Sequence, residues 1–372
     1  MVFLLCVFLA GIVIPQILLI AFRRKLFDVP DERKIHLGAV PRLGGIAFKP
    51  VVFLSVALVA GINMVLGHPE ILSGMEDEAQ PLVFVFCAIM VLYLVGIADD
   101  LIGVRYRAKF IIQILCGMML IAGGTWLGDL HGVMGIHAIP LWFGYPLTVL
   151  VAVFIINAIN LIDGIDGLAS GLCSIACLFY GVSFFALQQY TYAMLAFATL
   201  GVLVPFFYYN VFGNSKHNKK IFMGDTGSLT VGMMLCFLGI RLASCIPQES
   251  AGLPNPMILA FSPLLVPGLD VVRVYLHRVR NGKNPFLPDK NHIHHKLLAI
   301  GMRQRSAMVL IVSMSTVLVL LNIRLSCYLN VNWILLGDIL VWTIANIWLT
   351  SRIRRRCAGN KTKSQQAFNQ LK

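Results

Sequence analysis

The stretch VFLLCVFLAGIVIPQILLIAF, residues 2–22, contains no charged side chain and is followed at once by Arg23, Arg24 and Lys25. A helix of about 20 apolar residues is long enough to cross the ~30 Å hydrocarbon core of a bilayer. Basic residues gather on the cytoplasmic side of membrane spans. Because the basic triplet follows the apolar stretch and no basic region precedes it, we interpret the stretch as an uncleaved span that begins outside the cytoplasm, rather than as a signal peptide.

Apolar runs of similar length recur along the whole chain. The 372 residues are 58% hydrophobic and 13% charged, whereas soluble domains carry about 25% charged residues. So few charged side chains cannot cover the surface of several water-soluble cores, which excludes a soluble globular protein. We therefore predict an all-α, polytopic integral membrane protein of about eleven transmembrane helices. The ten further runs lie near residues 44–67, 81–98, 110–127, 143–161, 168–187, 190–209, 227–245, 257–272, 306–325 and 332–350.

Positive charge is concentrated in alternate connections between these runs. Of the 30 Lys and Arg residues, 27 lie in five segments, and the intervening connections hold none. The positive-inside rule places these segments and the C-terminus in the cytoplasm and the N-terminus outside, which requires an odd number of spans. Membrane topology thus explains the formal net charge of +13, and we expect no nucleic-acid partner. The five segments are residues 23–43, 99–109, 210–227, 273–305 and 351–372.

The informative acidic residues share the membrane face that the basic loops occupy. Carboxylates close to hydrocarbon are costly, so a set of them on one face indicates a functional site. The basic loops, together with residues 161–167, would then carry the active site of a single transmembrane catalytic domain, residues 1–350, followed by a basic cytoplasmic tail, residues 351–372. The acidic residues are Asp99, Asp100, Asp163, Asp166, Asp225, Asp270 and Asp289.

Asp99 and Asp100 are adjacent at the end of the run 81–98. Two neighbouring carboxylates repel each other, which raises the pKa of one of them unless a cation lies nearby. This arrangement favours a general base, or a carboxylate that faces a metal ion and a phosphate. The alternative is an exposed helix end whose charge is balanced by Arg105 and Lys109.

The stretch NAINLIDGIDGLASG, residues 157–171, has four polar side chains at intervals of three: Asn157, Asn160, Asp163 and Asp166. Residues spaced by three share a helix face, and their oxygen atoms suit a hard cation such as Mg²⁺. Gly164 and Gly167 loosen the helix where the span leaves the membrane. The alternative is a polar seam between two packed helices.

Asp225 lies in a glycine-bracketed turn in IFMGDTGSLTVG, residues 221–232. Backbone N–H groups at the start of the following helix attract phosphate, so this carboxylate is suited to hold Mg²⁺ over a phosphate group. The alternative is that Asp225 caps the helix, although Thr226 or Ser228 would serve equally well as a cap.

The longest cytoplasmic loop contains His292, His294 and His295 among the eight Lys and Arg residues of segment 273–305. Imidazole and basic side chains form charge-assisted hydrogen bonds with a diphosphate. A zinc site would also use His ligands, but the surrounding positive charge disfavours a dication. A plain basic loop on the membrane surface is the remaining alternative.

One membrane face thus combines carboxylates for Mg²⁺, basic groups for phosphates and glycine-bracketed turns. That combination fits phosphoryl transfer, in which catalysis consists mainly of positioning and charge neutralisation. A membrane enzyme of this kind would use a lipid phosphate and a cytoplasmic nucleotide-linked donor. A secondary transporter also carries ionisable residues in its spans, but it places them near the midplane and often has inverted repeats, a pattern that we do not find in this sequence.

Four motifs, in this order, resemble those of the polyprenyl-phosphate N-acetylhexosamine-1-phosphate transferases, glycosyltransferase family 4. The likeness extends from about residue 26 to residue 301, and the form HIHH resembles the branch of the family that uses UDP-N-acetylglucosamine (UDP-GlcNAc). The motifs are DD at 99–100, NAINLIDGIDGLA at 157–169, FMGDTGSL at 222–229 and PFLPDKNHIHHKLL at 285–298.

The resemblance implies transfer of GlcNAc-1-phosphate from UDP-GlcNAc to undecaprenyl phosphate with release of UMP, the first membrane step of a cell-envelope polysaccharide such as lipopolysaccharide. It implies Mg²⁺, or Mn²⁺, as the cofactor. It also implies a multi-pass location in the bacterial inner membrane with the active site on the cytoplasmic face, and it is compatible with a homodimer. The alternative is the same chemistry with another UDP-N-acetylhexosamine or with UDP-MurNAc-pentapeptide.

The resemblance also implies roles for individual residues. Asp225 and Asn160 match metal contacts, and either Asp99 or Asp100 matches the base beside the lipid phosphate. We hypothesise direct in-line attack by that phosphate, with a covalent aspartyl intermediate as the alternative. The implied substrate-binding residues are Asp28, Lys34, Asn157, Asp163, Asp166, Asn210, Phe222, His292, His294 and His295, of which Asp166 and Phe222 would lie towards uracil and the histidines towards the diphosphate.

Two features depart from the family pattern. Asn210 is followed by VFGNSKHNKK, a longer connection than is usual and one without proline. Either Asn210 or Asn214 would therefore take the role on the nucleotide side. Lys49 lies inside the second apolar run, where we expect its side chain to snorkel towards the cytoplasmic surface.

Overall fold

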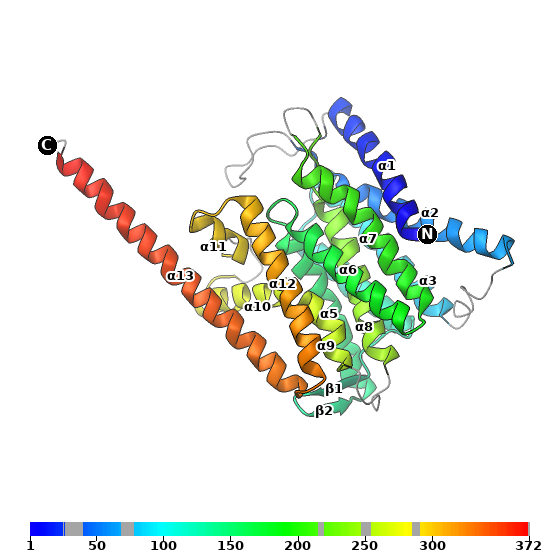
Figure 1. Ribbon diagram of the computed structural model, residues 1–372. Helices are drawn as coiled ribbons and strands as arrows, with labels where there is room; N and C mark the ends of the chain where they lie inside the picture. The colour runs from blue at the N-terminus through cyan, green and yellow to red at the C-terminus, as the bar shows by residue number, and fades with distance from the viewer. Residues whose placement is uncertain are drawn as a thin grey trace.

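The computed structural model describes residues 1–24, 26, 40–67, 78–214, 219–246, 254–284 and 291–370, with residues 357–370 described by backbone alone. Asp28, Lys34 and Asp289 therefore lie outside the described residues. The described chain is almost entirely helical, which confirms the predicted fold class (Figure 1). Its helices are α1 (Val2–Arg24), η1 (Gly44–Ala47), α2 (Phe48–Val65), α3 (Ala79–Ile102), α4 (Tyr106–Ala122), α5 (Leu141–Ile162), α6 (Leu168–Ala186), α7 (Tyr190–Val211), α8 (Gly224–Cys245), α9 (Pro256–Phe261), η4 (Ser262–Leu264), α10 (Leu265–Arg280), α11 (Ile293–Ala299), α12 (Gln304–Ser326) and α13 (Val331–Gln370).

Within the described residues, 10 helical segments are long and apolar enough to cross a membrane. The eleventh predicted span corresponds to α4, which is shorter but contacts α3 near both of its ends. At one end the Lys109 ammonium of α4 lies 3.0 Å from Asp99 of α3, and at the other end Gln80 of α3 donates to the Ala122 carbonyl of α4 (2.8 Å). Because α4 reaches both ends of α3, it crosses the same thickness, which supports eleven spans. The side of the membrane on which each terminus lies stays a prediction.

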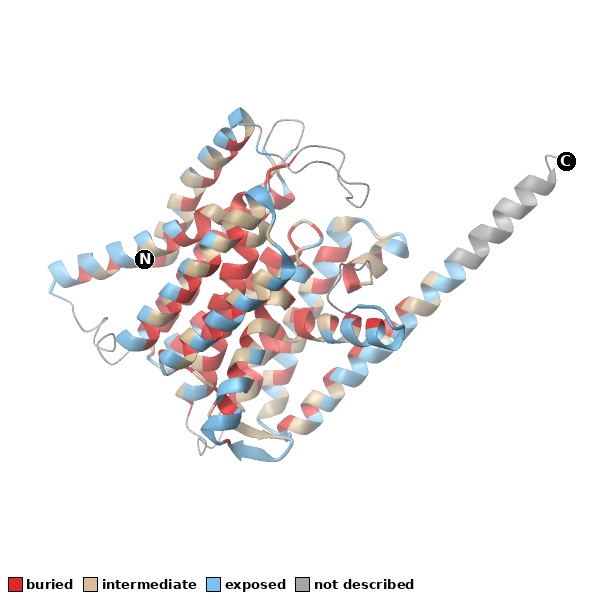
Figure 2. Cartoon of the chain, turned by 180° about the vertical axis from the view of Figure 1, so that it is seen from behind, coloured by how far each residue is buried: buried red, intermediate tan, exposed pale blue. Residues whose placement is uncertain are grey.

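Helix α8 lies at the centre of the bundle, where it packs against α3, α5, α6 and α9. Almost every residue from Thr226 to Ala243 is buried, and Figure 2 shows the buried residues concentrated inside the bundle. Small residues let helix backbones approach closely in a membrane. A Cβ atom at Gly96 of α3 would lie only 2.4 Å from the Cα of Thr226. Glycine at this position therefore brings the end of α3 directly onto the start of α8.

A small β-hairpin is the exception to the helical fold. Strands β1 (Asp129–Val133) and β2 (Ile136–Ala138) pair antiparallel in a connection that was predicted only as a loop without basic residues. Asn332 at the start of α13 donates to the Gly132 carbonyl, and Asn255 before α9 donates to the His131 carbonyl (both 2.8 Å). The hairpin thus joins α9 and α13 at one end of the bundle, which we call the hairpin end.

Two helices differ from the predicted boundaries. The span predicted at 257–272 consists of α9, η4 and α10 in succession, with Pro263 at the break, as is common where a helix kinks. Helix α13 continues to Gln370, through the segment that hydropathy alone separates as a tail, and its C-terminal part leaves the bundle (Figure 1). Hydropathy falls at residue 351, but Arg and Lys are good helix formers, so the helix itself does not end there.

Lys49 on α2 is buried, at 5% exposure, rather than extended to the surface. Its ammonium lies beside the sulfur of Met90, at 5.1 and 5.3 Å from the ring centroids of Phe53 and Tyr93. Attraction between a cation and aromatic ring faces offsets part of the cost of removing the charge from water. The expectation that Lys49 snorkels is therefore wrong.

Candidate active site

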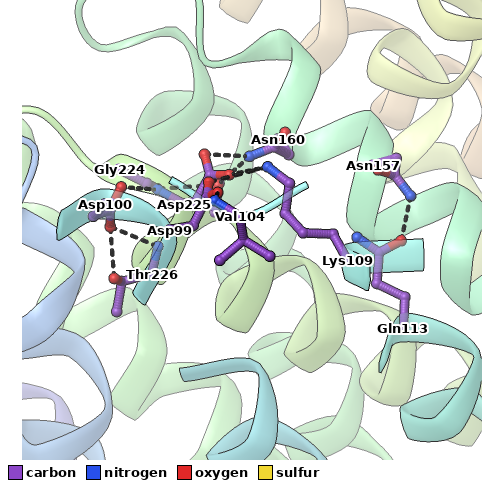
Figure 3. Close-up of polar contacts among 11 residues, drawn as sticks. Asp99, Asp100, Val104, Lys109, Gln113, Asn157, Asn160, Gly224, Asp225 and Thr226 are labelled. Carbon is purple, nitrogen blue, oxygen red and sulfur yellow. Dashed lines mark hydrogen bonds and ion pairs between the residues drawn. The ribbon is translucent and has the colours of Figure 1, made fainter. Parts of the chain in front are cut away.

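Most of the predicted site residues that the structure describes meet at the end of the bundle opposite the hairpin. The C-terminal ends of α3 and α5 and the N-terminal ends of α4 and α8 come together there (Figure 3). The turn at residues 163–167 directly follows α5. Sequence positions more than a hundred residues apart, Lys109 and Asp225, are in direct contact. We call this region the active-site end.

Asp225 is the second residue of α8, and its carboxylate is held from two sides. Its Oδ1 accepts a hydrogen bond from Asn160 Nδ2 of α5 (3.0 Å), and its Oδ2 lies 2.6 Å from Lys109 Nζ of α4. The preceding Gly224 has φ 72°, and a Cβ atom there would lie 2.2 Å from the Arg42 carbonyl oxygen. Glycine is therefore required before Asp225, both for the left-handed backbone and for the close approach of residue 42.

Asp100 caps helix α8 from the neighbouring helix α3. Its Oδ1 accepts the Asp225 N–H (2.8 Å), and its Oδ2 accepts both the Thr226 N–H (2.9 Å) and the Thr226 hydroxyl (2.6 Å). The capping alternatives for Asp225, Thr226 and Ser228 are therefore wrong, because Thr226 donates to Asp100 and Ser228 donates to the Gly224 carbonyl. A carboxylate at a helix N-terminus is stabilised by the unpaired N–H groups and the helix dipole.

Asp99 points towards Lys109 and Asp225 rather than towards the helix start. Its Oδ1 accepts the Val104 N–H (2.6 Å), and its Oδ2 lies 3.0 Å from Lys109 Nζ. The side chains of Asp99, Lys109 and Asp225 are 14%, 22% and 24% exposed. Lys109 balances Asp99, as the structural alternative supposed, but the same ammonium is shared with Asp225.

The two asparagines of the second motif lie at different depths. Asn160 donates to Asp225 and to the Ser228 hydroxyl (2.9 Å), so it belongs to the carboxylate cluster. Asn157, one turn earlier in α5, donates to Gln113 Oε1 of α4 (2.6 Å) and to the Val153 carbonyl (2.7 Å). Asn157 therefore forms the polar seam that was the alternative for this motif, and its substrate-binding role stays a prediction.

The turn that follows α5 carries Asp163 and Asp166. Burial, with the negative charges of Asp225 and Asp166 nearby, raises the pKa of Asp163 to about 7. Asp166 Oδ2 pairs with Lys220 Nζ at 2.6 Å, and the same ammonium lies 5.8 Å from the ring centroid of Phe222. Asp166 and Phe222, both predicted towards the uracil base, are thus brought to one place by Lys220.

Asn210 holds this arrangement together from α7. Its Oδ1 accepts the Gly167 N–H (2.6 Å) and its Nδ2 donates to the Ile221 carbonyl (2.8 Å), and the side chain is 5% exposed. It therefore joins the 163–167 turn to the segment that carries Lys220 and Phe222. The geometry supports a positioning role for Asn210, which would act on the nucleotide site through the residues that it holds. Direct contact between Asn210 and the nucleotide stays a prediction.

The His motif reaches the active-site end through two contacts. His292 Nδ1 donates to Asp270 Oδ2 (2.8 Å), and the fully buried Asp270 also accepts the Ile293 N–H (3.0 Å). His294 packs on the 163–167 turn so closely that a Cβ atom at Gly164 would lie 2.2 Å from its Nε2. The rings of His292 and His294 are nearly parallel, with centroids 5.8 Å apart, and the ring of His295 lies 4.2 Å from that of His294.

Burial and the neighbouring His295 and His292 rings lower the pKa of His294 to about 3. His294 is therefore neutral near pH 7. A neutral imidazole has one donor and one acceptor nitrogen, so His294 is suited to a hydrogen bond with a phosphate oxygen rather than to a salt bridge.

Several residues of the site were missed by sequence reasoning. Lys220 and Gln113 carry no motif signal, and Lys109 was considered only as a balancing charge. Lys220 stands two residues before Phe222, and a search for a base beside the aromatic residue would have found it. Gln113 lies inside an apolar run, where a lone amide is expected to hydrogen bond to a neighbouring helix.

The oxygen atoms around Asp225 fit a hard divalent cation. Within the ranges given above, no three His, Cys, Asp or Glu side chains are arranged to hold a metal ion by themselves. Mg²⁺ usually takes only one or two protein carboxylates and completes its shell with water and substrate phosphates. Asp225 and Asn160 would supply a carboxylate and an amide. The Lys109 ammonium, 3.0 Å from Asp99 and 2.6 Å from Asp225, marks a place where positive charge is favoured.

The fold and this cluster define a polytopic membrane protein with a site suited to phosphoryl transfer. The model of glycosyl transferase family 4 matches residues 82–243, from α3 to α8. Known proteins with similar sequences align with a longer part of the chain than this model does. The chain belongs to glycosyl transferase family 4, which confirms the resemblance drawn from the motifs.

Three relatives illustrate the likeness. The chain is 32% identical over 310 residues to the decaprenyl-phosphate N-acetylglucosaminephosphotransferase of Mycolicibacterium smegmatis, which covers 78% of this chain and 73% of the relative. It is 30% identical over 307 residues to the undecaprenyl-phosphate alpha-N-acetylglucosaminyl 1-phosphate transferase of Yersinia pestis (82% and 78%). It is 32% identical over 308 residues to the probable undecaprenyl-phosphate N-acetylglucosaminyl 1-phosphate transferase of Bacillus subtilis (81% and 77%).

Proposed function

We propose that this protein transfers GlcNAc-1-phosphate from UDP-GlcNAc to undecaprenyl phosphate, which gives undecaprenyl-diphosphate-GlcNAc and UMP. The printed names of the relatives describe transfer of this sugar phosphate to undecaprenyl or decaprenyl phosphate. The cluster of Asp99, Lys109, Asn160 and Asp225 at one end of the spans carries the proposal. That position suits a reaction between a lipid phosphate in the membrane and a water-soluble donor.

Asp99 is the base in this proposal. Both oxygens of Asp100 already accept hydrogen bonds from the start of α8, whereas Asp99 faces the Lys109 ammonium and Asp225. Asp99 takes the proton from undecaprenyl phosphate, and the freed oxygen attacks the β-phosphorus of UDP-GlcNAc. The bond from that phosphorus to the bridging oxygen breaks, and the electron pair leaves with UMP. The rival route uses an aspartate as nucleophile, and labelled sugar phosphate trapped on lipid-free enzyme would support that route instead.

Other residues of the chain bind the donor, and a bound metal ion would neutralise the negative charge of its diphosphate. Mg²⁺ or Mn²⁺ held by Asp225 and Asn160 would neutralise the diphosphate charge. The neutral His294 and the Asp270-held His292 donate to the diphosphate. The pair of Asp166 and Lys220, beside the Phe222 ring, receives the uridine.

The cellular setting follows from the charge distribution. The protein crosses the membrane several times, and the relatives are bacterial. The basic segments lie next to the active-site end, which supports an active site on the cytoplasmic face of the bacterial inner membrane. This orientation also gives a water-soluble cytoplasmic donor direct access to the site.

The test is release of UMP by the purified protein in detergent with undecaprenyl phosphate, with and without Mg²⁺. UDP-GlcNAc, UDP-N-acetylgalactosamine and UDP-MurNAc-pentapeptide are compared as donors under the same conditions. We expect metal-dependent UMP release that is fastest with UDP-GlcNAc. Metal-dependent release with a different donor would reassign the sugar, and no release with any of the three would contradict the enzyme function.

A further inference from the structure

Helix α11, which carries His294 and His295, has only seven residues. A helix this short is not stable by itself in water, so its position depends on the elements around it. On one side His294 packs on Gly164 of the active-site turn. On the other side α11 packs against α12 and the C-terminal helix α13.

The contact with α13 is polar and specific. Lys296 Nζ of α11 donates to Asn346 Oδ1 (3.2 Å) and to the Thr350 hydroxyl (3.1 Å) of α13. These acceptors are themselves fixed, because Asn346 Nδ2 donates to the Trp342 carbonyl (3.0 Å) and Thr350 donates to the Asn346 carbonyl (2.8 Å). Asn346 is 5% exposed. Lys296, Asn346 and Thr350 therefore form a preorganised contact, which we call the α13 latch.

A second contact supports the same docking. Gly301, two residues beyond the end of α11, has φ 92°, and a Cβ atom there would lie 2.0 Å from Nη1 of Arg356 on α13. Helix α13 thus touches this region at Lys296 and again just after α11 ends. Because Lys296 directly follows His295, a shift of the latch would move the His motif with it.

We propose that the α13 latch positions the His motif for the donor diphosphate. It holds α11 between α13 and the 163–167 turn, so that His294 stays against Gly164. Lys296, Asn346 and Thr350 act through His294 and are positioning residues. The inference rests on the proposed function, in which the His motif receives the diphosphate of the UDP-sugar.

A second polar contact anchors α13 to the bundle without involving α11, so it can be compared with the α13 latch. Near the hairpin end, Asn322 of α12 donates to Asp338 of α13 (2.8 Å) and to Ser262 of η4 (3.3 Å), and all three are buried. This contact also anchors α13 to the bundle, but none of its residues belongs to α11. It therefore separates the effect of anchoring α13 from the effect of positioning the His motif.

The experiment compares the wild type with the variant N346L/T350V. KM for UDP-GlcNAc, KM for undecaprenyl phosphate, kcat and Tm are measured in detergent. Each hydrogen bond between membrane helices affects an equilibrium by about threefold on average, so we expect the KM for UDP-GlcNAc to rise about tenfold. The KM for undecaprenyl phosphate should change less than twofold. The single variant Thr350→Val, which keeps the side-chain shape, should raise the donor KM about threefold.

Three controls accompany the variant. Thr343→Val makes the same change at an exposed position of α13 and should leave both KM values unchanged. Asn322→Leu should lower Tm without changing the donor KM. Adding Lys296→Met to N346L/T350V should restore the donor KM to within about twofold of the wild type, because replacing every polar partner by apolar groups leaves none unsatisfied.

The latch is overturned if N346L/T350V keeps the wild-type donor KM, if both KM values rise together with a fall in Tm, or if Lys296→Met gives no rescue. A wild type that releases no UMP would overturn the proposed function and this inference with it. An active wild type with an unchanged donor KM in the variant overturns the latch alone.

Discussion

Ion clusters lie at both ends of the bundle and join some of the same helices. At the hairpin end, Arg241 Nη2 of α8 donates to both carboxylate oxygens of Glu78, the residue before α3. The Tyr192 hydroxyl of α7 also donates to Glu78. The Arg241 guanidinium lies 4.9 Å from the Tyr192 ring centroid. At the active-site end, Asp99 and Asp225 share the single Lys109 ammonium.

The two clusters are equally buried but differ in charge balance. Arg241 and Glu78 are 15% and 20% exposed, close to the 22% and 24% of Lys109 and Asp225. In the described part of the chain, the cluster at the hairpin end pairs the Glu78 carboxylate with the Arg241 guanidinium. Among the described residues, two carboxylates share one ammonium at the active-site end. The pKa of Asp163 nearby is raised by the charge of Asp225 and lowered, to a smaller extent, by that of Arg42. Burial therefore does not distinguish a structural ion pair from a site. An excess of carboxylates over the cations paired with them among the described residues does, because it favours a bound cation.

The variant expected to have the largest effect on activity is Asp225→Asn. The variant removes the carboxylate that contacts both Asn160 and Lys109, and it also removes the excess negative charge. We expect kcat for UMP release to fall by at least about a thousandfold, while Tm stays the same or rises because the repulsion from Asp99 is lost. Glu78→Gln is the matched carboxylate at the hairpin end and should retain activity. Activity within tenfold of the wild type in Asp225→Asn would contradict the comparison.

The next test separates the adjacent aspartates. Asp99→Asn removes the proposed base and should lower kcat about a hundredfold, with little change in Tm. Asp100→Asn weakens the cap on α8 and should lower the free energy of unfolding by about 1 kcal/mol. Activity and thermal unfolding are measured on both variants. A larger loss of kcat in Asp100→Asn than in Asp99→Asn would exchange their roles.

A smaller effect is expected from Gly164→Ala. The added Cβ atom would lie 2.2 Å from His294 Nε2, so the ring must move away from the turn. Small displacements of binding groups are costly in preorganised sites, and we expect the KM for UDP-GlcNAc to rise about tenfold. Gly61→Ala is the control, because a Cβ atom at Gly61 meets nothing within 4 Å. A donor KM within twofold of the wild type would show that His294 does not need this position.

The sequence predicts the spans and the common location of the aspartates well, because both can be read from local composition: the length of each apolar run and the charge of each loop. The family resemblance implies that Asn160 and Asp225 share one metal site, and in the structure Asn160 donates to Asp225. The cap made by Asp100 and the depth of Asn157 could not be predicted, because both depend on which helix packs alongside. Lys49 shows the same limit. Its distance along the span favours snorkelling, but the aromatic rings around it depend on tertiary packing.

The smallest effect on activity is expected at the hairpin end, where the cluster is balanced. Arg241→Met leaves the Glu78 carboxylate partly buried without its cation and should lower the free energy of unfolding by about 2 kcal/mol. The double variant E78Q/R241M removes both charges and should recover most of that loss, and both variants should keep kcat/KM per folded molecule within twofold of the wild type. Helix α8 carries Arg241 near one end and Asp225 near the other. A large fall of kcat/KM in the double variant would therefore show that α8 transmits changes between its ends, and charge balance alone would then no longer separate a structural cluster from an active site.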